Sequence, residues 1–117
     1  MPSSPRAAIQ QHLEAVNAAD RDQLSATTMF PLFQGLGDGE KRWYATADEV
    51  PFPVPPNRFE IVSEEIWATT RDLVLFSLMA QILDPADAPL RQIHMLWSVH
   101  RVDDEWMVGW RQLLGEV

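Results

Sequence analysis

The predicted fold is decided by residues 90–114, LRQIHMLWSVHRVDDEWMVGWRQLL. Two apolar-rich runs flank the acidic pair Asp103-Asp104, and each run alternates with the two-residue period of a β-strand. This pattern predicts a long antiparallel hairpin with a two-residue loop at the acidic pair. One face of that hairpin is almost wholly apolar, so another layer of the protein must cover it.

Unbroken pairing of the hairpin gives these cross-strand partners: Val102 with Glu105, Val99 with Val108, Trp97 with Trp110, and Ile93 with Leu114. Both paired tryptophans then point to the apolar inner face, which Met95 and Gln112 share. The opposite face is mixed and carries the following residues: His94, Leu96, Ser98, His100, Met107, Gly109 and Arg111. The prediction therefore turns both tryptophans inward and both histidines outward.

The N-terminal part of the chain predicts two helices. In residues 7–20, AAIQQHLEAVNAAD, apolar side chains recur at helical spacing, and His12 lies on the same stripe. Asp20 suits the N-cap of a second short helix over residues 21–28. We expect Phe30-Pro31 to end that helix, because the residue before a proline avoids helical geometry.

Strands dominate the rest of the chain. Residues 32–45, LFQGLGDGEKRWYA, predict a second hairpin around a glycine turn. The alternative is a phosphate-cradling loop, but that needs a helix after the glycines, and the strand-like EKRWYA follows instead. One turn of helix is expected over residues 46–49, and then strands over residues 58–67 and 73–83. Between the short helix and the first of these strands, PFPVPP is expected to be a stiff connector.

Strand 73–83 is apolar on both of its faces. Val74, Phe76 and Leu78 share one face, whereas Leu75 and Met79 lie on the other. A sheet open to water on one side shows cleaner alternation. We therefore expect a second copy of the chain to cover the outer face through a two-fold axis. Helices followed by long antiparallel strands predict an α+β fold in which the helices pack on a curved sheet.

Composition argues against several classes of function. The formal net charge is −8, whereas nucleic acid and anionic membrane surfaces attract basic proteins, so neither partner is expected. The chain has no cysteine, which excludes disulfides and thiolate chemistry. Its 117 residues suit a single domain over 1–117, with residues 1–5 as a disordered lead-in. No signal-peptide pattern or spanning run is visible, and a cytoplasmic location is expected.

One segment carries a family resemblance. QQHLEAVNAADRDQL, residues 10–24, resembles the first two helices of nuclear transport factor 2-like domains, the superfamily of SnoaL-like polyketide cyclases and ketosteroid isomerase. MFPLF, the GDG hairpin, YATADEV and the final hairpin follow in the order of that family, and the match covers most of the chain. The resemblance implies a conical α+β barrel, a pocket inside the cone and a homodimer formed through the sheets.

The resemblance also implies positions for chemistry. In the isomerases a tyrosine of the first helix hydrogen-bonds the substrate eight residues before the aspartate that ends the helix, and His12 stands there in this chain. The base of the isomerases corresponds to Leu36 in an ungapped count, and the nearby Asp38 belongs to the predicted turn. This departure leaves an isomerase assignment without its base, so catalysis stays open.

The candidate site residues each have a plain alternative. His12 is either a catalytic or pocket group or a core histidine bonded to a carbonyl. The expected ligand contacts are Tyr44, Met95, Trp97, Trp110 and Gln112, although tryptophans more often fill a core. His94 and His100 lie about 20 Å apart along one strand and cannot share one ion. No metal or cofactor is expected.

Two functional hypotheses follow. The first is a small-molecule-binding domain whose cone holds an apolar or polar-tailed organic ligand, with proton transfer, cyclisation or dehydration as the chemistry if it is an enzyme. The second is a non-catalytic dimerisation module whose cone is filled by its own side chains. The volume inside the cone separates them, because ligand pockets are larger than about 300 Å³.

Overall fold

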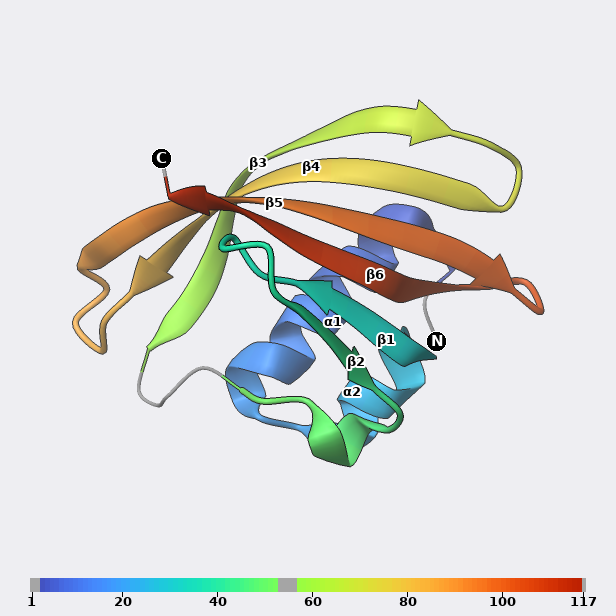
Figure 1. The fold of residues 1–117 in the computed structure, drawn as a ribbon, viewed down its shortest axis with the longest axis horizontal. Helices are drawn as coiled ribbons and strands as arrows, with labels where there is room; N and C mark the ends of the chain where they lie inside the picture. Colours follow the sequence, from blue (N-terminus) through green and yellow to red (C-terminus); the bar gives the residue numbers. More distant parts are fainter. Residues whose placement is uncertain (1–2, 53–56, 117) are drawn as a thin grey trace.

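The computed structural model describes residues 3–52 and 57–116, which form two α-helices, one short 3₁₀ helix and a six-stranded sheet. The elements are, in chain order, α1 (Pro5–Ala18), α2 (Arg21–Thr27), β1 (Thr28–Gly35), β2 (Lys41–Tyr44), η1 (Ala47–Glu49), β3 (Arg58–Thr69), β4 (Leu73–Leu83), β5 (Pro89–Val102) and β6 (Glu105–Glu116). The strand order is β2-β1-β6-β5-β4-β3. Both helices lie on one side of a curved sheet, as Figure 1 shows. The predicted α+β fold is confirmed, with a curved sheet that does not close.

Local signals set the ends of the two helices. The Ser4 hydroxyl accepts a hydrogen bond from the Ala7 amide at 3.1 Å, and Pro5 occupies the first turn, where it costs no hydrogen bond. Ala19 adopts the left-handed conformation, with φ 51°, and Asp20 then caps α2 by accepting from the Gln23 amide. The predicted lead-in over residues 1–5 is therefore too long, since the helix begins at Pro5; residues 1–2 lie outside the described part.

Phe30-Pro31 does not end the second helix, contrary to the prediction. The helix ends at Thr27, and Thr28 is already extended. The Phe30-Pro31 step lies inside β1, which pairs antiparallel with β2 and parallel with β6. Parallel pairing between the first and last strands places the proline in a strand that runs beside the final hairpin (Figure 1).

The final hairpin forms, but its pairing is broken by an extra residue. Asp103 and Asp104 form the predicted two-residue loop with positive φ angles of 51° and 66°. Val99 pairs with Val108 as predicted, and the register then shifts so that Ser98 pairs with Trp110. Gly109 is left without a partner between these two pairs, so it forms a β-bulge. The extra residue reverses the face to which the following side chains of β6 point.

The predicted pairing of Trp97 with Trp110 is therefore wrong. Trp97 pairs with Arg111, so Arg111 faces inward and Trp110 faces outward. A second shift at Leu114 pairs Ile93 with Glu116, which also corrects the predicted Ile93–Leu114 pair. Position 109 favours glycine because the neighbouring side chains pack closely there, and a Cβ on Gly109 would lie 2.7 Å from His100 Cδ2.

The core lies between the helices and the inner face of the sheet. Strands β4 and β5 contribute most of it, and α1 covers them with Ala8 and Ile9. The inner side chains of β4 are all buried: Val74, Phe76, Leu78, Ala80 and Ile82. A smaller apolar cluster joins α1 and α2 to β1 and to the segment after η1. No helix in residues 3–52 and 57–116 has both the length and the hydropathy of a membrane span.

Apolar side chains also gather on the side of the sheet that faces away from the helices. We call this surface the outer face; it comprises Phe33, Trp43, Trp67, Leu75, Met79, Leu96, Met107 and Trp110. Trp43 is 66% exposed and Trp67 is 53% exposed. Phe33 stacks on Trp110 at 5.9 Å between ring centroids and meets Trp43 edge-on at 4.9 Å. The outer face thus crosses the sheet from β2 to β3.

Candidate functional site

A cavity of about 470 Å³ lies on the inner side of the sheet. We call it the cone cavity; its lining residues from the strands include Tyr44, Ile93, Met95, Trp97, Arg111 and Leu113, and Leu13 and Val16 line it from α1. Pro51 and Phe52, which follow η1, form another wall. The volume lies within the range of about 300–1,000 Å³ that is common for ligand pockets.

Arg21 holds the wall that follows η1. Its guanidinium donates hydrogen bonds to the carbonyls of Ala47 and Val50, the latter at 3.0 Å. It also lies 4.5 Å from the centre of the Phe52 ring, a cation–π distance. Because Arg21 belongs to the first turn of α2, these contacts fix the wall of the cone cavity to the helices.

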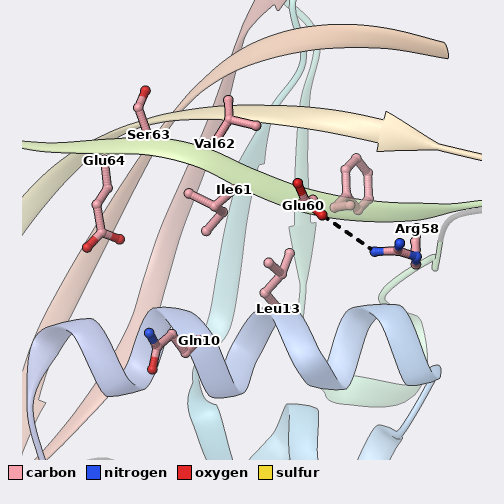
Figure 2. A pocket seen from close by; sticks show the side chains of 9 residues that line it. Gln10, Leu13, Arg58, Glu60, Ile61, Val62, Ser63 and Glu64 are labelled. Atoms are coloured by element: carbon pink, nitrogen blue, oxygen red, sulfur yellow. Dashed lines mark ion pairs between the residues drawn. The ribbon is translucent and has the colours of Figure 1, made fainter. Parts of the chain in front are cut away.

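A second hollow lies beside the cone cavity, between α1 and β3. It has a volume of about 420 Å³ and shares Leu13 and Phe59 with the cone cavity. Figure 2 shows Leu13 and Ile61 pointing toward one another across it, while Val62 and Ser63 point to the other side of the strand. Arg58 and Glu60 at its edge form an exposed ion pair (Figure 2). This hollow has no buried polar group of its own among its lining residues.

The polar end of the cone cavity is an arginine bonded to a buried histidine. Arg111 Nη1 lies 3.1 Å from His12 Nε2, and His12 has no exposed surface. His12 Nδ1 lies 3.0 Å from the Thr28 hydroxyl, and the ring meets Trp97 edge-on at 5.1 Å between centroids. An arginine can only donate, so Nε2 must accept, and Nδ1 then carries the proton that it donates to Thr28.

Burial controls the charge of both groups. It lowers the pKa of His12 well below its usual value, and the positive charge of Arg111 lowers it further. Burial also lowers the pKa of Arg111 to about 10, with Tyr44 acting in the opposite direction. At neutral pH the pair is therefore a neutral imidazole beside a charged guanidinium.

Acid is expected to destabilise the protein through His12. Below pH 6.5 His12 is protonated in the unfolded chain, whereas its lowered pKa keeps it neutral in the folded chain. The free energy of unfolding therefore falls as pH falls. The slope reaches about 1.4 kcal/mol per pH unit for one such group. Urea unfolding at pH 7, 6 and 5 should show this loss, and His12→Gln, whose amide oxygen can still accept from Arg111, should lose about 1–2 kcal/mol less by pH 5.

His100 also contributes to the pH dependence of the free energy of unfolding. Burial lowers its pKa as well, so part of the loss in acid remains in His12→Gln. Equal pH slopes in the wild type and His12→Gln would contradict the assignment of a neutral, buried His12.

The structure separates the predicted site residues into two groups. Tyr44, Met95 and Trp97 line the cone cavity, and His12 lies directly behind it in contact with Arg111 and Trp97. Trp110 and Gln112 do not line it, because the bulge turns both to the outer face. Gln112 lies over Gly35, where a Cβ would come within 2.4 Å of its Cδ. The prediction of Trp110 and Gln112 as inward ligand contacts is thus wrong in geometry.

Arg111 is the site residue that the sequence prediction missed. It was expected to face outward, in a regular hairpin. An isolated glycine in a strand is a recognised sign of a bulge, and Gly109 supplied that sign. The other two histidines do face outward as predicted: His94 lies 2.6 Å from the Ser77 hydroxyl and His100 lies 2.8 Å from the Ser98 hydroxyl.

Neither Asp38 nor the glutamates of β3 join the site. Asp38 belongs to the turn after β1, where it accepts from the Glu40 amide at 2.9 Å. Glu64 faces α1 and pairs with Arg6, while Glu65 faces the opposite way. In residues 3–52 and 57–116, no three acidic or histidine side chains lie together as a metal site requires.

No protein-family model matches the sequence, and no curated protein matches it. Solved structures do match. The NTF2-like protein from Cytophaga hutchinsonii is 15% identical over 92% of each chain, with a TM-score of 0.71. An uncharacterized protein with a cystatin-like fold from Caulobacter vibrioides is 12% identical over 96% of this chain and 86% of its own, with a TM-score of 0.74. LinA is 15% identical over 92% of this chain and 83% of its own, with a TM-score of 0.68.

At these identities the likeness shows the fold alone. It is the nuclear transport factor 2-like, cystatin-like fold that the sequence resemblance predicted.

Proposed function

We propose that this nuclear transport factor 2-like domain binds a small organic molecule in the cone cavity. The observation that carries the proposal is a cavity with a largely apolar lining and the half-buried Arg111 in its wall. A filled cone would leave less than about 300 Å³, whereas this cavity measures about 470 Å³. Arg111 reaches it from β6, and Trp97 and Met95 supply flat and adaptable apolar surface.

The geometry favours binding over acid–base chemistry by His12. Its Nε2 already accepts from Arg111 and its Nδ1 donates to Thr28, so both ring nitrogens are occupied. A general base needs a free lone pair within reach of the substrate proton. We therefore assign His12 the role of orienting Arg111, and any reaction in the cavity would use the cationic guanidinium to stabilise negative charge.

A cavity-narrowing substitution tests the proposal. Leu113 lines the cone cavity, whereas its neighbour Leu114 does not and is 43% exposed. Binding of 3-phenylpropanoate and 3-phenylpropanamide should be measured by calorimetry in the wild type, Leu113→Trp and Leu114→Trp. We expect at least one compound to bind, with at least about tenfold weaker binding in Leu113→Trp and no change in Leu114→Trp. The proposal would be contradicted if Leu113→Trp left the dissociation constants unchanged, or if neither compound bound at millimolar concentration.

A homodimer through the outer face is our second proposal. Eight large apolar side chains of the outer face cross all six strands, and its two tryptophans at the sheet edges are more than half exposed. Soluble monomers rarely expose large continuous apolar surfaces. A two-fold axis would bury the same surface on each copy, without using the cone cavity.

A further inference from the structure

The charge of Arg111 is not paired with an acidic side chain in the part of the chain that the structure describes. Among residues 3–52 and 57–116, seven side-chain ion pairs form and none involves Arg111. The chain has 17 acidic residues and a net charge of −8, so acidic groups are abundant, yet none of the described ones forms an ion pair with this arginine. Arg111 is half-buried and carries its charge at the wall of the cone cavity, so a partner of opposite charge bound in the cavity would gain a charge-assisted contact there.

The hydrogen bonds of Arg111 are also incomplete. A guanidinium has five N–H donors, and within the described residues the bond to His12 is the one that it makes. Its Nε is buried and has no acceptor there. The side chain as a whole is half-buried and lines the cone cavity, so its unused donors belong to the wall of a pocket. A planar guanidinium with free donors suits a carboxylate, which accepts two parallel hydrogen bonds.

His12 fixes the arginine for this role. It accepts from Nη1, is itself held by Thr28, and stays neutral because burial and Arg111 both lower its pKa. A carboxylate at the same place would have cancelled the charge of Arg111; a neutral imidazole orients it and leaves the charge available. This arrangement positions a cation without neutralising it.

The rest of the lining defines the body of the ligand. Leu13, Val16, Ile93, Met95, Trp97 and Leu113 surround the cavity with apolar atoms. Arg91 is the other basic residue of the lining, but it pairs with Glu116 at 2.9 Å and is largely exposed. A single charged head and a hydrocarbon or aromatic body therefore fit this lining better than a polyanion such as a nucleotide.

We propose that the cone cavity takes an apolar monocarboxylate, whose carboxylate pairs with Arg111 and whose aliphatic or aromatic body packs against Trp97, Met95 and Leu113. This inference rests on the proposed function, because it names the class of ligand for the same cavity. It assigns Arg111 as the residue that selects an anion over a neutral molecule of the same shape.

Matched ligands test the assignment. Calorimetry should compare 3-phenylpropanoate with 3-phenylpropanamide in the wild type, Arg111→Met, Arg111→Lys and Arg91→Met. In the wild type we expect the carboxylate to bind at least about tenfold more tightly than the amide. In Arg111→Met this ratio should fall to about one, through weaker binding of the carboxylate, while Arg111→Lys should keep part of the preference because it keeps a cation.

The outcomes distinguish the two proposals. Equal binding of both compounds to the wild type, still weakened by Leu113→Trp, would overturn the carboxylate assignment and leave the cone cavity as a ligand site. A preference that survives Arg111→Met and disappears in Arg91→Met would move the charge contact to the mouth of the cavity and overturn the role of Arg111. Absence of binding by either compound would overturn both proposals. Retained cooperative unfolding of Arg111→Met would show that its result does not come from loss of the fold.

Discussion

His12→Leu is expected to lower the free energy of unfolding by about 3 kcal/mol, because it leaves the Arg111 charge without its hydrogen-bond acceptor. Adding Arg111→Met removes the charge as well, and the double variant should return to within about 1 kcal/mol of the wild type. Arg111 is half-buried and borders the cone cavity, which keeps the cost below that of a fully enclosed ion. Urea unfolding of the wild type, His12→Leu, Arg111→Met and the double variant gives the coupling free energy between the two side chains.

His100→Leu is the matched control for that cycle. His100 is half-buried on the opposite side of the sheet and bonds to Ser98 rather than to a charged group. Its loss should cost less than about 1 kcal/mol. If the double variant were as unstable as His12→Leu, the stability would come from packing of the imidazole, and the account of Arg111 as an uncompensated cation would fail.

Leu96→Glu is expected to convert the proposed dimer into a monomer. Leu96 is half-buried and lies on β5 near the middle of the outer face, and a two-fold axis would place two new carboxylates in one interface. A central apolar contact is worth about 2 kcal/mol or more per copy, so the dissociation constant should rise by about a thousandfold. Sedimentation velocity at micromolar concentration should show a dimer for the wild type and a monomer for the variant.

Ile66→Glu provides the comparison. Ile66 is 53% exposed, like the outer-face tryptophans, but it pairs with Phe76 and so points to the helix side of the sheet. This variant should remain a dimer. A wild-type monomer, or a dimer that tolerates Leu96→Glu, would rule out association through the outer face.

Regular patterns were enough to predict most of the architecture. Strand β4 spans Leu73–Leu83 as expected, because every second side chain from Val74 to Ile82 is apolar. Asp103-Asp104 forms the expected loop, and Asp20 caps α2 as expected. Each of these features depends on neighbours in the sequence, which is the information that a single chain displays.

The site was harder to predict because it depends on one residue that breaks a pattern. Regular alternation from Val108 onward assigns Trp110 and Gln112 to the inner face and Arg111 to the outer face. The bulge at Gly109 exchanges them, so that Arg111 faces inward and the other two face outward. The parallel pairing of β1 with β6 joins residues far apart in sequence, and no local pattern reports it. Sequence periodicity therefore predicted the inner face on which the cavity lies, but it assigned Arg111, the charged residue of the cavity, to the outer face.

The central claim is that the cone cavity, with Arg111 at its polar end, is the ligand site. Intermolecular nuclear Overhauser effects between 3-phenylpropanoate and assigned side chains test it most directly. The account predicts contacts from the phenyl protons to Leu13, Ile93 and Leu113, which line the cavity. Contacts to Leu75, Met79 or Leu96 instead would place the ligand on the outer face and contradict the account.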